Sequence, residues 1–275
     1  MTTADLRPLS APAVAPGHRL KWLLSDVATM TWRNLVALTR IPESLFFATL
    51  QPIMFVLLFR FVFGGAISTG VPGVTYVDFL MPGIFVQTVC FGAVSTSIGL
   101  ADDLQKGLIE RFRALPMARS AVLGGRTTAD LVRNVFVVAI MTGVGYLVGF
   151  RITTNFFSYL VGVVILLLFA YALSWGFACI GLSAPNAETA QVISFPILFP
   201  LTFASSAFVP VSSMSGWLQA FATYQPVSVV VDAARSLMLG GAYTSTRHVL
   251  GALAWSIGLL VVLVPLAVRQ YRRTA

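Results

Sequence analysis

Long runs of apolar residues constrain this chain more than any other feature. The clearest lie at about 45–66 and 157–183, the second containing "VVILLLFAYALSWGFACIGL". An α-helix needs roughly 20 such residues to cross a bilayer, and a run this long must be helical because lipid cannot hydrogen-bond to a free backbone. Four further runs of similar character lie at about 78–100, 127–149, 191–210 and 248–268. The sequence therefore predicts an all-α polytopic membrane protein with six transmembrane helices.

The run at 191–210 is the least regular because it contains Pro196 and Pro200. Transmembrane helices tolerate proline where neighbouring groups satisfy the freed carbonyls. Composition supports the membrane assignment, since 57% of the residues are hydrophobic and only 10% are charged, whereas soluble domains carry about a quarter charged residues. We therefore retain the fifth span.

Lysine and arginine residues predict the orientation of the chain. Thirteen of them lie in the N-terminal segment, the loop after the second run and the C-terminal tail, against three in the outward connections. Positive residues in short loops mark the cytoplasmic side, so both termini are expected in the cytoplasm. The net charge of +8 is spread over these three segments. This distribution favours membrane-surface contact over nucleic-acid binding.

The segment before the first span divides into two parts. Residues 1–18 are rich in proline and alanine and predict a disordered tail without a cleavable signal peptide. Residues 19–41 carry apolar residues at helical spacing, with Trp22 and Trp32 as interfacial anchors. We expect an amphipathic helix on the cytoplasmic membrane surface, with a short soluble helix as the alternative. Residues 42–275 form the transmembrane domain.

A charged segment at 102–116 follows the second span. Its apolar residues recur at helical spacing at Leu104, Leu108, Phe112 and Leu115, while its charged residues occupy the other faces. Asp102 or Asp103 can cap the start of such a helix, and Pro116 ends it. Periodicity alone leaves two interpretations open, a helix among lipid headgroups and a docking helix for a cytoplasmic protein.

No motif in the sequence groups the residue types that catalysis or metal binding would require. A phosphate-binding P-loop needs Gly-Lys followed by Ser or Thr, but the only lysines lie in "LKW" and "QKG". Cys90 and Cys179 fall in separate spans, and His18 and His248 lie at opposite membrane faces. We therefore expect no enzymatic activity in this chain alone, no bound metal and no cofactor.

The outward connection at 211–240 is too apolar for an ordinary solvated loop. Ser212, Ser213 or Ser215 is a candidate cap for a first short helix, and a second follows Gln225-Pro226. Neither is long enough to span a bilayer, so we expect a re-entrant hairpin covered by protein. It either acts as an outer gate or fills the outer end of the bundle. The candidate gate residues, with an ion pair expected between the last two, are Trp217, Tyr224, Asp232 and Arg235.

Two segments carry a distinctive set of residues. In the first, residues 79–134, these are Pro82-Gly83, Asp103, Gly107, Arg111-Phe112-Arg113, Leu115-Pro116, Arg119 and Gly125-Arg126. The second, residues 208–240, contains Val-Pro, Gly-Trp and Gln-Pro pairs and an arginine before the last span. In these features the chain resembles type-2 ABC exporter permeases, and among these the daunorubicin-resistance permeases of actinobacteria. Together with the six spans, the resemblance covers most of the chain beyond residue 30.

The resemblance implies an exporter driven by a separate motor. Two such permeases, most simply a homodimer, would dock on two copies of a cytoplasmic ABC ATPase that binds ATP and Mg. Movement of the ATPase would reach the membrane through the helix at 102–116, which the resemblance makes a coupling helix. The expected ATPase-coupling residues are Asp103, Lys106, Gly107, Glu110, Arg111, Arg113, Leu115 and Pro116.

In this class of permease the second and fifth spans face a substrate cavity. Gln87, Phe91 and Ser95 share one helical face, as do three phenylalanines of the fifth span, while packing or lipid contact is the alternative for these aromatic stripes. Gln51 and Arg60 are polar residues within the first span, and snorkelling to the outer surface is the expectation for Arg60. The expected substrate-path residues are Gln51, Gln87, Phe91, Ser95, Phe195, Phe199 and Phe203.

The implied function is ATP-driven export of an amphipathic or hydrophobic compound, such as a drug, a polyketide or a lipid-like metabolite. The expected absence of charge at the cavity positions favours a largely apolar substrate. The chain would lie in the cytoplasmic membrane of an actinobacterium. Two alternatives remain open, a permease for a polysaccharide or teichoic-acid precursor and a non-transporting anchor or sensor that recruits a cytoplasmic partner.

Overall fold

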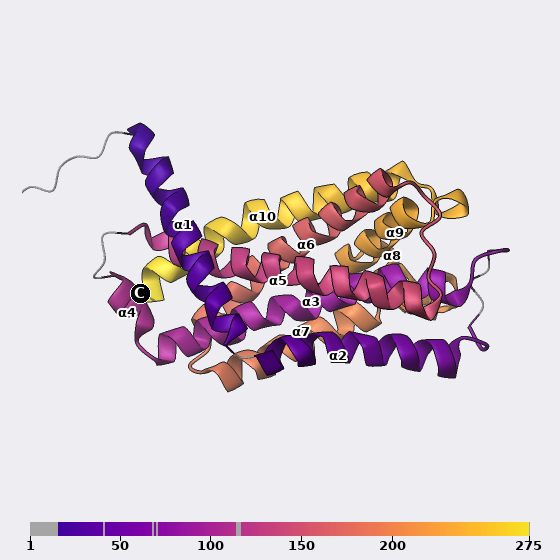
Figure 1. Ribbon diagram of the computed structural model, residues 1–275, viewed down its shortest axis with the longest axis horizontal. Helices are drawn as coiled ribbons and strands as arrows, with labels where there is room; N and C mark the ends of the chain where they lie inside the picture. The colour runs from indigo at the N-terminus through magenta and orange to yellow at the C-terminus, as the bar shows by residue number, and fades with distance from the viewer. Residues whose placement is uncertain (1–15, 41, 68, 70, 114–116, 275) are drawn as a thin grey trace, which may run out of the picture.

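The computed structural model describes residues 16–40, 42–67, 69, 71–113 and 117–274, and every regular element in these ranges is helical. The long helices run roughly parallel along the long axis of the molecule (Figure 1). They form where the sequence carries its apolar runs, because burying or embedding these side chains requires a satisfied backbone. These helices are α2 (Pro42–Leu58), α3 (Tyr76–Gln105), α5 (Arg119–Val148), α6 (Phe156–Ser183), α7 (Ala187–Phe203) and α10 (Thr246–Thr274).

In the described residues, five helices are long and apolar enough to cross a membrane: α3, α5, α6, α10 and α2 with its π-helical continuation, Phe59–Phe63. The expected fifth span at 191–210 differs. Its helix, α7, begins at Ala187 and ends at Phe203, with 17 residues. At 1.5 Å per residue it is about 25 Å long, less than the roughly 30 Å hydrocarbon core. Six spanning helices therefore stay a prediction.

Helix α3 forms the centre of the bundle. In the most apolar stretch of α3, 72% of the residues are buried, whereas 11% are buried in the corresponding stretches of α2 and α10. Its neighbours include α6, α7, α5 and α9 (Pro226–Met238). Two glycines permit close approach, since a Cβ on Gly83 would lie 2.1 Å from the Ala207 carbonyl oxygen and one on Gly181 would lie 2.5 Å from that of Ser97.

Replacing Gly83 with alanine should destabilise the fold. The added methyl group would force α3 away from the Ala207 backbone, and overpacking of this kind costs about 1–3 kcal/mol. Thermal unfolding of the detergent-purified protein should show a lower Tm than that of the wild type. Gly143→Ala in α5 is the matched control, because nothing lies within 4 Å of its added Cβ. An unchanged Tm for Gly83→Ala would contradict the close packing.

Helix α1 (Pro16–Thr39) crosses one end of the bundle at a steep angle (Figure 1). It packs on α5, where Val27 and Met30 lie against Gly124 and Gly125. The short helix α4 (Leu108–Arg113) and the C-terminal end of α10 lie at the same end. Helices α1 and α4 and the C-terminal end of α10 therefore share one end of the bundle, and that this end faces the cytoplasm stays a prediction. The position of α1 in the membrane surface stays a prediction.

The opposite end of the bundle contains α8 (Gly216–Tyr224) and α9 (Figure 1). The segment at 211–240 therefore contains two short α-helices, as expected, preceded by a 3-10 turn at Val211–Ser213. Only α9 is buried, between α10, α6 and α3. Ser215 occupies the cap position of α8, but its side chain makes no capping hydrogen bond.

Candidate functional site

The segment at 102–116 is not one continuous helix. Helix α3 continues through Gln105, a turn follows at Lys106 and Gly107, and α4 then runs from Leu108 to Arg113. Gly107 has φ +66°, a left-handed conformation that glycine adopts without the steric cost of a Cβ. The break corrects the expected coupling helix and explains Gly107 by backbone geometry. Leu115 and Pro116 lie outside the described residues, so the expected end at Pro116 is untested.

Asp103 faces the interior rather than the surface. Its Oδ2 lies 3.2 Å from Arg33 Nη2 and 3.7 Å from Arg126 Nη1, so one carboxylate joins α1, α3 and α5. The Arg33 guanidinium also lies 4.7 Å from the centre of the Phe112 ring. This arrangement links α4 to the bundle through α1. It gives Asp103 an internal contact between three helices, while its part in coupling to an ATPase stays a prediction.

The other charged residues of this segment differ in position. Lys106 and Arg111 are exposed, and Lys106 Nζ donates to Asp102 Oδ2 at 2.7 Å. This hydrogen bond raises the pKa of Lys106. The side chains of Glu110 and Arg113 lie outside the described part of the structure. Arg111 and Lys106 are therefore the described candidates for polar contact with a cytoplasmic partner.

Asp103→Asn should lower the stability of the folded protein by about 1–3 kcal/mol, because two arginines would lose their shared carboxylate. Thermal unfolding in detergent measures this as a lower Tm. Asp102→Asn is the matched control, since it removes the exposed pair with Lys106, and exposed pairs contribute at most about 1 kcal/mol. Equal Tm values for the two variants would contradict the internal role of Asp103.

A cavity of about 320 Å³ lies between α2, α3, α5 and α7. It brings together Gln51, Gln87, Phe91, Ser95 and Phe195, which are five of the expected substrate-path residues. Sequence reasoning missed other parts of its wall. These are Phe47 and Phe55 of α2, Arg133 and Asn134 of α5, and Gln191 of α7.

Phe199 and Phe203 do not line this cavity but continue its aromatic wall. The Phe91 ring contacts the rings of both Phe195 and Phe199, with centroid distances of 6.0 and 5.9 Å, and those two rings lie 6.1 Å from each other. Phe203 lies 5.0 Å from Phe199 and 6.1 Å from Phe55. The aromatic stripes of α3 and α7 therefore contact each other and α2, so both the cavity and the packing interpretations apply to parts of this wall.

Two amide side chains of the cavity wall carry buried polar atoms without a hydrogen-bond partner. They are Gln87 Oε1 and Asn134 Nδ2. The residues are 3% and 2% exposed, respectively. A buried polar group without a partner is unfavourable by about 1–3 kcal/mol. Both atoms have almost no accessible surface, so a molecule in the cavity would reach them only after the wall rearranged.

Charge also lies beside the cavity, which corrects the expectation that its wall is uncharged. Arg133 lines it and donates to the Gly92 carbonyl oxygen at 2.5 Å. Asp130 lies 3.5 Å from Arg133 and accepts hydrogen bonds from Ser95 and Thr96. The i, i+3 and i+4 spacing of Asp130, Arg133 and Asn134 places these residues on one face of α5. Polar residues at this spacing within an apolar run are the sequence signal that could have identified this site.

A second cavity, of about 630 Å³, adjoins the first at the predicted cytoplasmic end. Ser95 and Arg133 line both cavities. The second is strongly charged, with Arg33, Asp103 and Arg126 in its wall. The two cavities thus place charged groups nearest the predicted cytoplasm and aromatic groups within the bundle.

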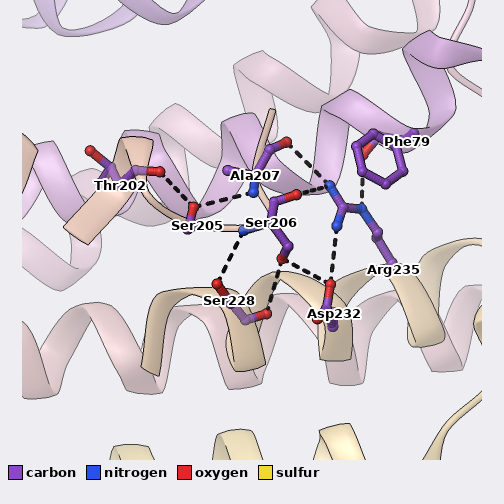
Figure 2. A network of polar contacts seen from close by, with 8 residues as sticks. All are labelled: Phe79, Thr202, Ser205, Ser206, Ala207, Ser228, Asp232 and Arg235. Atoms are coloured by element: carbon purple, nitrogen blue, oxygen red, sulfur yellow. Dashed lines mark hydrogen bonds and ion pairs between the residues drawn. The ribbon is translucent and has the colours of Figure 1, made fainter. Parts of the chain in front are cut away.

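At the opposite end, Arg235 forms the centre of a buried polar network (Figure 2). Arg235 is 2% exposed. Its Nη1 lies 3.0 Å from Asp232 Oδ1, the ion pair expected from the i,i+3 spacing. It donates to the carbonyl oxygens of Phe79 at 3.0 Å, Ser206 at 2.6 Å and Ala207 at 3.2 Å. One side chain therefore connects α9 to α3 and to the segment after α7.

This network explains how α7 can end at Phe203, although the sequence predicts a span as far as about residue 210. Residues 204–208 follow α7 and are not helical, and 205–208 are buried, so their backbone groups need other partners. Arg235 supplies two of these, while Tyr76 donates to the Phe208 carbonyl oxygen at 3.0 Å and Gln225 to that of Ala204 at 2.6 Å. Side chains from distant segments thus replace the missing helical hydrogen bonds.

The candidate gate residues do not form one group. Asp232 and Arg235 belong to the buried network, whereas Trp217 and Tyr224 lie exposed on α8.

Arg60, the arginine within the first span, lies beside Gly149, and its guanidinium is 5.5 Å from the centre of the Phe61 ring. Within the described residues, no group of three or more His, Cys, Asp or Glu side chains is placed to hold a metal ion.

Comparison with known proteins adds a family relationship. A family model described as "ABC-2 type transporter" matches residues 25–239. The chain is 35% identical to the daunorubicin resistance ABC transporter permease protein DrrB1 of Streptomyces coeruleorubidus, covering 98% of this chain and 90% of that protein. It is 27% identical to a probable doxorubicin resistance ABC transporter permease, DrrC, of Mycobacterium tuberculosis, covering 100% and 99%. A putative transport permease, ycf38, of Porphyra purpurea is 22% identical, with 88% and 84% covered.

Proposed function

This chain belongs to the ABC-2 type transporter family, and from this premise we propose that it is the permease subunit of an exporter for amphipathic or hydrophobic compounds. The observation that supports this proposal most directly is the cavity between α2, α3, α5 and α7. Its wall combines aromatic rings with a few polar groups, the usual composition of a small-molecule site. Relatives with names referring to daunorubicin or doxorubicin resistance support a drug, polyketide or lipid-like substrate.

The energy for export would come from a separate ABC ATPase. The chain has no P-loop lysine, and its family implies association with such a subunit. We propose two ATPase copies, which would bind ATP and Mg, and a second copy of this chain as the other half of the membrane domain. The complex would lie in the cytoplasmic membrane.

Coupling would begin at the exposed turn between α3 and α4. Lys106 and Arg111 are exposed there, while Asp103 and Phe112 connect the segment to Arg33 of α1. A push on α4 by the ATPase would therefore reach α3 directly, and α5 through Asp103. These two helices carry the polar wall of the cavity. Alternating access would follow from a change in their spacing, with the substrate released outward.

A strain that lacks the gene tests this function in the cell. Untargeted metabolite profiling should show a compound retained inside the deletion strain, and a panel of apolar drugs should inhibit it at lower concentrations than the parent. Restoring the gene should reverse both effects. Unchanged metabolites and unchanged drug sensitivity would contradict the proposal.

A further inference from the structure

The second cavity, at the predicted cytoplasmic end, carries an excess of positive charge. Its described lining residues include four basic and three acidic side chains. Two of the acidic groups have a cation of their own, since Asp102 lies 2.7 Å from Lys106 and Asp130 lies 3.5 Å from Arg133. Asp103 is the carboxylate that the other two arginines share. Among the described residues of this wall, one positive charge is therefore not neutralised.

The two arginines that share Asp103 are Arg33 of α1 and Arg126 of α5. Arg33 Nη2 donates to Asp103 Oδ2 and to Asn34 Oδ1, both at 3.2 Å, and Arg126 Nη2 donates to the Ser95 carbonyl oxygen at 3.3 Å. Arg126 Nη1 lies 3.7 Å from Asp103 Oδ2, beyond the usual hydrogen-bond length. Each guanidinium has five N–H donors, so the Nη1 and Nε groups of both arginines have no hydrogen-bond acceptor among the described residues. An anion between α1 and α5 would therefore find donors from two helices.

Apolar side chains complete the wall of this cavity. Ala37 and Leu38 come from α1, and Leu108 and Phe112 come from α4. The volume of about 630 Å³ lies within the range of small-molecule sites. An inorganic anion would leave the apolar groups uncovered, whereas an anion linked to a hydrocarbon chain would cover them. The wall therefore fits an amphipathic anion better than a free one.

We propose that this cavity holds the headgroup of an anionic phospholipid, with Arg33 and Arg126 as the residues that bind its phosphate. Planar guanidinium groups pair with phosphate oxygens through two parallel hydrogen bonds. Basic pockets between helices at the cytoplasmic side of a membrane protein suit such headgroups. The lipid would join α1 to α5 beside the Asp103 contacts and would stay bound while other compounds are moved. The inference therefore does not depend on the proposed export function.

Three probes test this site with the delipidated full-length protein in detergent. Phosphatidylglycerol is anionic, phosphatidylcholine with the same acyl chains carries a compensating quaternary ammonium, and inorganic phosphate has no acyl chain. Native mass spectrometry gives the Kd of each lipid, and thermal unfolding gives the Tm with each probe. Phosphatidylglycerol should raise the Tm and bind roughly tenfold more tightly than phosphatidylcholine, the effect of one hydrogen bond to a charged group. Inorganic phosphate at the same concentration should leave the Tm unchanged.

Substitutions of opposite charge should change lipid binding in opposite directions. Arg33→Gln and Arg126→Gln each remove one guanidinium and should lower the preference for phosphatidylglycerol roughly tenfold. Asp103→Asn removes the competing carboxylate, so it should tighten the binding of phosphatidylglycerol although it lowers the Tm of the lipid-free protein. A damaged fold cannot produce this combination. The direction of the Asp103→Asn effect therefore keeps the test informative where an arginine variant folds poorly.

Arg40→Gln is the matched control. Arg40 lies exposed directly after α1 and does not line the cavity, so this variant should keep the wild-type preference. An equal loss of preference in Arg40→Gln would attribute lipid binding to general surface charge and overturn the inference. Equal Kd values of the two lipids for the wild type would also overturn it, as would weaker binding of phosphatidylglycerol by Asp103→Asn. A rise in Tm with inorganic phosphate equal to that with phosphatidylglycerol would assign the site to a free anion and contradict the lipid.

Discussion

Arg235→Ala should prevent most of the chain from accumulating as a folded membrane protein. The substitution would leave the carbonyl oxygens of Phe79, Ser206 and Ala207 without this donor, and the Asp232 carboxylate without its cation. Each unpaired buried group costs about 1–3 kcal/mol, and breaking a buried ion pair costs about 3–5 kcal/mol. A loss of about 4 kcal/mol or more is a large part of the 5–15 kcal/mol that holds a typical protein folded.

Two variants separate this effect from a simple change in charge. Arg235→Lys retains the positive charge but has no planar fork with which to reach several carbonyl oxygens, so it should also lower the Tm. Arg247→Ala removes an exposed arginine at the start of α10 and should leave the Tm unchanged. The measurements are the amount of monodisperse protein after detergent extraction and its Tm. A normal yield and Tm for Arg235→Ala would show that the network does not support the break after α7.

A double substitution, Glu110→Ala with Arg111→Ala, should uncouple the permease from its ATPase. The two residues lie in α4, and Arg111 is exposed. Removing both charged groups should reduce ATP-driven transport on the order of tenfold, a typical size for energetic coupling between sites. Membrane insertion and Tm should stay close to those of the wild type, because these substitutions do not change the Asp103 contacts that hold this end of the bundle.

The control for this variant is Arg151→Ala, which removes an arginine from the opposite end of the bundle. Transport is measured in inside-out vesicles and normalised to the amount of inserted permease. The ATPase that co-purifies with the permease is measured by quantitative immunoblotting. Transport at the wild-type level by the double variant would show that α4 does not take part in coupling. Reduced membrane insertion would show instead that the two residues are needed for folding.

Much of the fold follows directly from the apolar runs. Helices α3, α5, α6 and α10 form where such runs lie, since a lipid-embedded backbone has no alternative. Helical periodicity also placed Gln87, Phe91 and Ser95 on one cavity wall, and the i,i+3 spacing of Asp232 and Arg235 allowed their ion pair. These features depend on residues that are close in the sequence.

Other features depend on contacts between distant segments. The early end of α7 requires hydrogen bonds from Tyr76, Gln225 and Arg235, and no local pattern at 204–210 indicates them. The participation of Asn134 in the cavity depends on which face of α5 turns toward α3. The break at Gly107 had a local signal, the glycine itself, but the apolar stripe across it favoured a continuous helix. Tertiary packing decided these cases.

The most direct test of the central claim is ATP-dependent uptake of a hydrophobic dye by inside-out vesicles that contain this permease and its ABC ATPase. Uptake should require ATP hydrolysis, and it should be lost when the permease is absent or when the P-loop lysine of the ATPase is replaced. The dye should also stimulate hydrolysis by the complex. A stable complex with the ATPase, but with neither uptake nor stimulated hydrolysis for any amphipathic compound tested, would contradict an export function and favour a membrane anchor.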